Sequence, residues 1–362
     1  MLFSLTLSPF AFSAFFAVKR FSGNVEKQSD KGETRMKRLG LVLTILALAA
    51  AGCNKGGPAP AEKGKADTSN QLYIEVSALG SLDYFYDHKM GMEMAGKALG
   101  VRTEYVGPAD YDMNAMANVF ELAIARNPKG LVVVGFENSL NALVDKAAAK
   151  GIPVVTVDAD LPGSRRIAFV GTGNYRAGFE GGKKMAALVG GKGKVALMTK
   201  PGQSNLEERI RGYQEALKQS PGIEVVRVAD TQSDPVVAAQ AAGSLLQQYP
   251  DLAGIACVEA AGGTGAATAV REANRIGKVK IVAMDRGNEV LEYIKDGVIS
   301  ATVAQQTALM PFYAVQILYN LNNHPVPVTS DNAKAGITGV PEVIDTGVVI
   351  IDKDNCQYFV RK

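Results

Sequence analysis

The stretch Lys280–Gln306, KIVAMDRGNEVLEYIKDGVISATVAQQ, decides the fold of this chain. Its first residues are apolar and predict a buried strand that ends at Asp285. A helix is predicted next, because apolar residues recur at helical spacing, and Gly297 closes it before a second strand that ends at Gln305. Ligands of open α/β sheets bind outside the carboxyl ends of the strands, so Asp285 and Gln305 are expected to face a ligand cleft.

The rest of the chain repeats this alternation of short apolar segments with longer helical patterns, which predicts an α/β fold with parallel sheets. Eleven segments are predicted strands: Leu72–Val76, Arg102–Val106, Gly130–Val134, Ile152–Val157, Ile167–Val170, Lys194–Met198, Ile223–Val228, Gly254–Val258, Lys280–Met284, Ile299–Val303 and Gly347–Ile351. More than ten strands would be many for one doubly wound sheet, so we expect two lobes with five or six strands each. Gly171–Asn174, GTGN, is the expected first crossing between them.

The overall charge argues against a nucleic-acid partner. The formal net charge is +3, but residues 1–52 hold seven Lys/Arg and three Asp/Glu, which leaves 32 basic and 33 acidic residues in the remainder. Phosphate binding requires a dense basic face, and the remainder has no such excess.

The amino-terminal part predicts export and lipid anchoring. Lys37 and Arg38 precede the apolar run Leu39–Ala51, which ends in small residues and Cys53. A charged start, a short apolar run and small residues are typical of a signal peptide, and the cysteine resembles the lipobox of bacterial lipoproteins. We therefore expect residues 36–52 to be a signal peptide and Cys53 to be lipidated, with an ordinary cleaved signal as the alternative.

Two flanking segments complete this part of the chain. Residues 1–35 are expected to be an upstream extension, because a complete signal begins at Met36; a genuine membrane anchor is the alternative. Residues 53–70 are rich in Gly, Pro, Ala and Lys, which predicts a flexible tether.

The other two cysteines, Cys257 and Cys356, have no metal-ligand spacing, so no metal site and no cofactor are expected.

A set of short motifs in a fixed order resembles the periplasmic sugar-binding proteins of ABC importers related to ribose-binding protein. The resemblance covers about residues 72–322. The motifs are Val76-Ser77, Ile152-Pro-Val-Val-Thr-Val-Asp158, Gly171–Asn174 with Ala177-Gly178, Glu208-Arg209-Ile-Arg-Gly212-Tyr213, Tyr249-Pro250-Asp251, Met284-Asp285, and Asp296-Gly297 through Ala304-Gln305.

This resemblance implies a fold, a function and a ligand site. Family members have two similar lobes joined by three crossing segments and close on a sugar, which they present to an importer. Here it implies an N-lobe of residues 71–174 plus 306–335 and a C-lobe of 175–305 plus 336–362, in a monomeric, lipid-anchored protein outside the cytoplasmic membrane. The ligand contacts carried over by position are Ser77, Tyr84, Phe85, Tyr86, Asp158, Arg209, Asp285 and Gln305, with Glu259 as a further candidate.

The chemistry of these residues fits a sugar. Asp158 and Asp285 can each accept hydrogen bonds from two neighbouring hydroxyls, Arg209 donates in a planar fork, and Gln305 does both. The aromatic residues supply a flat apolar face for sugar C–H groups. Four positions depart from ribose binders, which argues against ribose itself: Gly135, Ala159, Ser233 and Glu259.

Structural roles for the same residues stay open. The aromatic cluster can pack a helix onto the sheet, and at least one of its rings is expected in the core. Either aspartate can serve as a turn or cap residue, and Arg209 can pair with Glu208 or Glu207 on a helix surface. Glu259 can bind a ligand hydroxyl or amine, or form a salt bridge with Arg286.

Other functions compete with sugar binding. Gly262–Ala267, GGTGAA, follows a strand and precedes Asp285, as in a dinucleotide-binding fingerprint, so an NAD-dependent oxidoreductase is the main alternative. The third glycine position is Thr268, which departs from that fingerprint. A sugar-sensing receptor without transport is a further alternative, and a transcriptional regulator would need a helix-turn-helix before residue 70, where the signal and tether lie.

Overall fold

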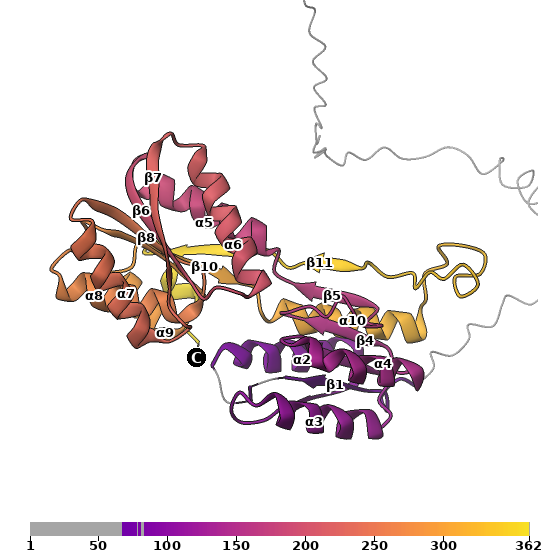
Figure 1. Ribbon diagram of the computed structural model, residues 1–362. Coiled ribbons are helices and arrows are strands. Elements are labelled where there is room, and N and C mark those ends of the chain that lie inside the picture. Colours follow the sequence, from indigo (N-terminus) through magenta and orange to yellow (C-terminus); the bar gives the residue numbers. More distant parts are fainter. Residues whose placement is uncertain (1–66, 78, 81–82, 362) are drawn as a thin grey trace, which may run out of the picture. The chain divides into compact units, whose positions relative to one another are not determined.

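The computed structural model describes residues 67–77, 79–80 and 83–361. Asp67–Lys362 forms one compact unit, distinct from residues 1–66. The predicted signal peptide, Cys53 and most of the tether lie outside the described residues. Within Asp67–Lys362, the described chain folds as two α/β lobes, each around a six-stranded sheet (Figure 1).

The N-lobe sheet has the strand order β11-β5-β4-β3-β1-β2, with all pairs parallel. Its strands are β1 (Leu72–Val76), β2 (Arg102–Val106), β3 (Gly130–Val134), β4 (Val154–Val157), β5 (Ala168–Gly171) and β11 (Val343–Asp345). Its helices are α2 (Tyr86–Leu99), α3 (Met113–Ala125), α4 (Asn141–Ala149) and α10 (Leu309–Asn323), with short 3-10 turns at Asp83–Phe85 and Asn138–Leu140. Helices α2 and α10 pack against each other, as do α3 and α4.

The C-lobe sheet has the order β12-β10-β9-β8-β6-β7. Its strands are β6 (Lys192–Thr199), β7 (Gly222–Asp230), β8 (Leu252–Cys257), β9 (Lys280–Met284), β10 (Ala301–Gln305) and β12 (Val348–Asp352). Its helices are α5 (Asn174–Leu188), α6 (Ser204–Lys218), α7 (Pro235–Gln248), α8 (Ala260–Glu272) and α9 (Asn288–Lys295), with a 3-10 turn at Cys356–Tyr358. The sheet is parallel, as predicted, except at its edge: strand β12 runs antiparallel to β10.

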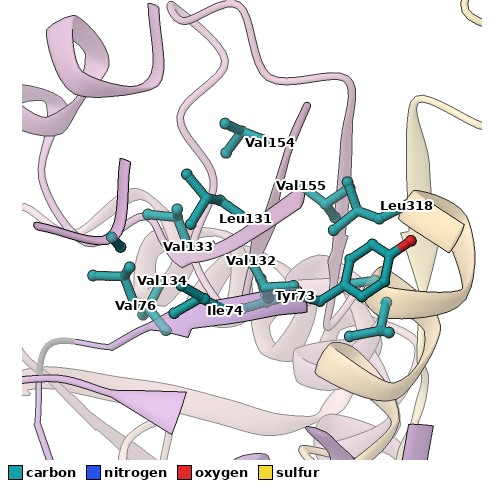
Figure 2. Close-up of a cluster of buried hydrophobic side chains, with 14 of the residues drawn as sticks. Tyr73, Ile74, Val76, Leu131, Val132, Val133, Val134, Val154, Val155 and Leu318 are labelled. Atoms are coloured by element: carbon teal, nitrogen blue, oxygen red, sulfur yellow. The ribbon is translucent and has the colours of Figure 1, made fainter. Parts of the chain in front are cut away.

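Buried strands explain why the sheets form where the apolar segments lie. In the N-lobe, β1, β3 and β4 fill the core together with Leu318 of α10 (Figure 2). Every residue of β3 is buried, as expected for a parallel strand covered by helices on both faces. The C-lobe has a hydrophobic cluster on each face of its sheet, one around α5 and α6 and one around α7, α8 and α9.

Three segments connect the lobes, as predicted. They follow β5 at residues 172–173, β10 at 306–308 and β11 at 346–347. Three hydrogen bonds join the chain at the first and third crossings: Gly173 N donates to Asp345 Oδ1 (2.8 Å), and Thr346 donates to Gly171 O from its backbone N (2.8 Å) and from its Oγ1 (3.1 Å). Gln306 also donates its side-chain amide to Thr346 O, so the three crossings are linked to one another.

One predicted lobe boundary is wrong. We expected residues 336–362 to belong to the C-lobe, but β11 pairs with β5 in the N-lobe sheet. Strand β11 is three residues long and largely exposed, so it has no apolar pattern that could reveal it in the sequence. The chain crosses for the third time after Asp345, not near residue 336.

Candidate functional site

Asp158 and Asp285 occupy equivalent places in the two lobes. Asp158 follows β4 and Asp285 follows β9, each directly after the last residue of its strand. Both have a left-handed backbone, with φ of 65° and 66°. Each backbone N–H donates to the neighbouring strand, from Asp158 to Val170 O (3.3 Å) and from Asp285 to Val303 O (2.9 Å). Non-glycine residues adopt this conformation rarely and at a cost of about 1–3 kcal/mol, which is typical of functional sites.

Arg209 of α6 is the most completely bonded of the candidates. Its side chain is buried, and its three nitrogens donate to Asn174 Oδ1 (2.8 Å), Val258 O (3.0 Å) and Gln305 Oε1 (3.0 Å). These partners lie at the start of α5, after β8 and at the end of β10. Arg209 therefore does not pair with Glu208 on the helix surface, because Glu208 pairs with Arg211 instead.

Glycine packing places Arg209 in this position. A Cβ atom at Gly178 of α5 would overlap the backbone of Arg209, and one at Gly212 of α6 would overlap the backbone of α5. Only glycine lets the two helices approach so closely. Gly178 and Gly212, which belong to the motifs quoted above, thus allow α6 to pack closely on α5 at Arg209.

Gln305 connects Arg209 to Asp285 through two hydrogen bonds. Its amide Nε2 donates to Asp285 Oδ1 (3.0 Å), while its oxygen accepts from Arg209. Loss of contact with water raises the pKa of Asp285; Arg209 and Gln305 lower it, and the charges of Asp158 and Glu259 raise it, with a net increase. Asp158 of the N-lobe is thus among the charges that act on Asp285 of the C-lobe.

Tyr84 and Asp158 form the N-lobe half. The Tyr84 hydroxyl donates to Asp158 Oδ1 (2.7 Å), and its ring packs edge-on against Phe85 at 5.1 Å between centroids. Burial raises the pKa of Tyr84 well above its usual value, and the charges of Asp158 and Asp285 add to this increase. Tyr84 is therefore in contact with Asp158 of its own lobe, and charges of both lobes act on its pKa. We call Tyr84, Asp158, Arg209, Asp285 and Gln305 the interlobe site.

Among the described residues, the remaining aromatic and hydroxyl candidates form no side-chain hydrogen bond with these five. Phe85 is in the N-lobe core with 1% of its surface exposed, which confirms the expectation that one ring of the cluster is core. Tyr86 is half exposed on α2, and the structure does not bring it together with Tyr84. Ser77 is fully buried after β1, where its hydroxyl accepts from Leu79 N (3.4 Å).

Glu259 caps a helix. Its Oε2 accepts from Ala261 N (2.8 Å) in the first turn of α8, and its Oε1 accepts from Thr231 (2.9 Å). The possible salt bridge to Arg286 is not formed, because Arg286 pairs with Asp87 across the lobes (2.7 Å). A carboxylate at a helix N-terminus is stabilised by the helix dipole, which accounts for Glu259 without a ligand.

The glycines of the dinucleotide-like motif are packing residues inside α8. A Cβ atom at Gly263 would lie 2.7 Å from Ala283 Cβ of β9, and one at Gly265 would lie 2.5 Å from Ala238 Cβ of α7. The N-terminus of α8 already holds the Glu259 carboxylate, where a pyrophosphate would have to bind. This geometry contradicts the dinucleotide-binding interpretation.

Asn174 is the residue of the network that sequence reasoning missed as a contact. It ends the GTGN motif and begins α5, so its side chain lies where the first crossing enters the C-lobe. The signal was present in the motif, but its pairing with Arg209, 35 positions later, required the packing of α5 on α6.

Two of the departures from ribose binders also have a structural reason. A Cβ atom at Gly135 would lie 2.5 Å from Ala159 O, so the turn after β4 leaves no room for a side chain there. Ser233 has a left-handed backbone, with φ of 55°, in the loop before α7. A side chain at position 135 would therefore require a shift of the backbone.

In the described part of the chain, no group of three or more His, Cys, Asp or Glu side chains could hold a metal ion. Over the same residues, no helix is long and apolar enough to cross a membrane.

A model of the periplasmic binding protein domain matches residues 76–324. The chain is 30% identical over 248 residues to the D-allose-binding periplasmic protein of Escherichia coli, covering 65% of this chain and 79% of that one. It is 30% identical over 263 residues to a D-apiose import binding protein of Paraburkholderia graminis, covering 72% and 80%. AraP, an arabinose binding protein from Geobacillus stearothermophilus, superposes with a TM-score of 0.76 at 37% identity, over 81% of this chain and all of that one.

Proposed function

The chain belongs to the periplasmic binding protein family, as a solute-binding protein and not an enzyme, and we propose that it captures a small sugar or polyol between its lobes and delivers it to an ABC importer. This proposal rests mainly on the equivalent placement of Asp158 and Asp285: each lies at a strand end of its own lobe and has a left-handed backbone. A ligand between them would be contacted from both sides.

The hydrogen-bonding capacity of the interlobe site suits a ring of hydroxyl groups. Each aspartate has one oxygen engaged by a protein side chain, by Tyr84 or Gln305, and its second oxygen can accept from a ligand hydroxyl. Arg209 has five N–H groups and uses three in the bonds described above, so two can donate to ligand oxygens. A site that matches hydroxyls in this way rejects analogues that lack them, because buried polar groups would be left unpaired.

Closure of the lobes would couple binding to transport. A ligand that touches both lobes stabilises the closed form by its higher affinity for that form, and the importer would then recognise the closed surface. Gln305 ends β10 immediately before the second crossing, so a ligand contact there would act directly on the hinge.

Relatives suggest the class of sugar. D-allose, D-apiose and arabinose are named for the three relatives described above, and all are monosaccharides. We propose a ligand of the same class, a pentose, a hexose or a related polyol. Ribose is disfavoured, because Ala159 stands where ribose binders have an arginine.

Export and lipid anchoring on Cys53 are part of the proposal. They would place the protein outside the cytoplasmic membrane, where the predicted tether would give the lobes access to an importer. The test is the intact mass of the protein extracted with detergent: a chain that begins at a diacylated Cys53 is expected. Recovery of residues before Cys53 in the mature chain would contradict it.

Thermal-shift screening of the chain from Asp67 onward tests the ligand class. The panel contains pentoses, hexoses, polyols, amino acids and NADH. A ligand that binds only the folded state stabilises it and so raises the melting temperature. At a ligand concentration of a hundred times the dissociation constant, the free energy of unfolding increases by about 2.7 kcal/mol. We expect a shift with at least one sugar or polyol, whereas shifts with amino acids or NADH alone would refute the proposal.

A further inference from the structure

Asp87 is a buried carboxylate that none of the ligand contacts uses. It lies in the first turn of α2, one residue after Tyr86, with 1% of its side chain exposed. Its neighbours along α2 include the exposed pair Glu93 and Lys97, whereas Asp87 faces inward. A buried charge is costly unless it is paired and hydrogen-bonded, so its partners matter.

Three donors from outside α2 converge on Asp87. Arg286 Nη2 donates to Oδ2 (2.7 Å), Arg361 Nη2 donates to Oδ2 (3.1 Å), and Thr307 Oγ1 donates to Oδ2 (2.9 Å). Arg361 Nε also lies 3.4 Å from Oδ1. We call these four residues the Asp87 cluster.

The donors come from three parts of the molecule with different roles. Arg286 directly follows Asp285 of the interlobe site, and Thr307 belongs to the second crossing. Arg361 belongs to the segment after the 3-10 turn Cys356–Tyr358, and this segment is tied to Arg286 as well, because Arg286 Nη1 donates to Phe359 O (2.8 Å). Asp87 itself is on the N-lobe helix that packs along α10.

The electrostatics of the cluster favour an ionised Asp87. Burial raises its pKa, but the hydrogen bond from Arg361 and the charges of Arg286 and Arg361 outweigh burial, so that the net effect is a lowered pKa. The helix N-terminus also favours a negative charge in this turn. Two arginines share one carboxylate, so removal of its charge would leave both without an anionic partner in the cluster.

We propose that Asp87 is a positioning residue for ligand binding: it ties the loop after Asp285, the second crossing and the segment 359–361 to the N-lobe, and so sets the arrangement of the two lobes around the interlobe site. Through Arg361, the segment after the last 3-10 turn would also contribute to the arrangement of the two lobes. The proposal concerns the lobes and not the identity of the ligand.

The distance between the lobes in the ligand-free protein tests this directly. Spin labels on cysteines that replace exposed Lys150 at the end of α4 and exposed Lys218 at the end of α6 report one distance between the N-lobe and the C-lobe. The experiment uses the chain from Asp67 onward, which lacks Cys53; its two cysteines, Cys257 and Cys356, are buried and serve as the unlabelled background. In Asp87→Asn we expect the population at the native distance to fall at least about thirtyfold relative to other distances, as for loss of one partner of a buried charge pair.

Two further variants keep the test decisive. Arg361→Gln removes one donor from the other side of the cluster and is expected to broaden the same distance distribution even where Asp87→Asn fails to fold. Glu93→Gln, which removes an exposed carboxylate from the same helix, is expected to leave the distribution unchanged. Unchanged distances in Arg361→Gln or in a folded Asp87→Asn, with only a lower melting temperature, would show that the cluster merely stabilises the fold and would overturn the proposal.

Discussion

The two halves of the interlobe site are built by different means. In the C-lobe, Asn174, Arg209, Gln305 and Asp285 form one continuous chain of side-chain hydrogen bonds. In the N-lobe, among the described residues, Asp158 accepts a side-chain hydrogen bond from Tyr84 alone, and Tyr84 is held by the packing of its ring. The C-lobe half is therefore fixed by polar bonds before a ligand arrives, whereas the N-lobe half depends on aromatic packing.

This difference predicts that substitutions in the C-lobe half have the larger effects. Asp285→Ala should abolish ligand binding, with a loss of at least about a hundredfold in affinity, because a buried ligand hydroxyl would lose its charged acceptor. The fold should persist, since removal of this carboxylate takes away a group whose burial is unfavourable. Titration calorimetry and melting curves measure the two effects, and a variant that binds normally would remove the centre of the site.

Arg209→Met tests whether the C-lobe half is one network. The substitution leaves Asn174, Val258 O and Gln305 without their donor, so we expect the free energy of unfolding to fall by about 2–4 kcal/mol. Ligand affinity should fall as well, because Gln305 would no longer hold Asp285. Urea unfolding measures the stability, with Arg211→Met, an exposed arginine on the same helix, as the control expected to change it by less than about 0.5 kcal/mol. Equal effects of the two substitutions would contradict the network.

Tyr84→Phe should have a smaller effect, because it removes one hydrogen bond and keeps the ring. We expect about a tenfold loss of ligand affinity, as for a hydrogen bond to a charged group, and little change in melting temperature. Tyr86→Phe is the matched control on the same segment, since Tyr86 is half exposed. If Tyr84→Phe reduced stability by as much as Arg209→Met, the contrast between the two halves would be wrong.

The smallest expected effect is a pH dependence that arises from a buried pair in the N-lobe half. Beneath Tyr84, fully buried His88 and Glu75 lie 2.6 Å apart, from Nδ1 to Oε1. Burial lowers the pKa of His88, but Glu75, with Asp158 and Asp87, raises it more, so the net pKa is raised. The stabilisation by this pair should be complete below about pH 6.5, the pKa of an unfolded histidine, and should be lost as the pH rises through the raised value of the folded state.

Denaturant unfolding at several pH values checks this prediction. The double variant Glu75→Val and His88→Leu, which replaces both partners by apolar residues, should lose the decline in stability toward high pH. A decline of the same size in the double variant would assign the pH dependence to other groups. The C-lobe half has a titrating group of its own, Asp285, whose raised pKa makes stability fall as the pH rises from the pKa of an unfolded aspartate through the raised value.

The contrast between the halves also shows what the sequence could and could not predict. Asp158, Asp285 and Gln305 were predictable, because each stands at the end of an apolar segment and a strand end fixes where its side chain lies. The double role of Glu259 as a cap and as the partner of Thr231 was not, since it depends on the pairing of β7 and β8 through β6.

Hydrogen bonds between residues far apart in the chain could not be predicted from the sequence for the same reason. The bond between Arg286 and Asp87 joins residues 199 positions apart, and no local pattern marks either of them as a partner. Strand β11 was missed because a three-residue, exposed strand carries no periodicity. Residues whose role is set by strand ends, helix caps or close glycine packing are readable from local patterns, whereas residues whose role is set by the meeting of two lobes are not.

The central claim is that a single sugar is held by both lobes, through Asp158 and Asp285. Titration calorimetry of one sugar from the thermal-shift panel with wild type, Asp158→Asn and Asp285→Asn tests it most directly. We expect one binding site per chain in the wild type and at least about a tenfold loss of affinity in each variant. An affinity unchanged by either substitution would mean that the ligand is held by one lobe, and would contradict the claim.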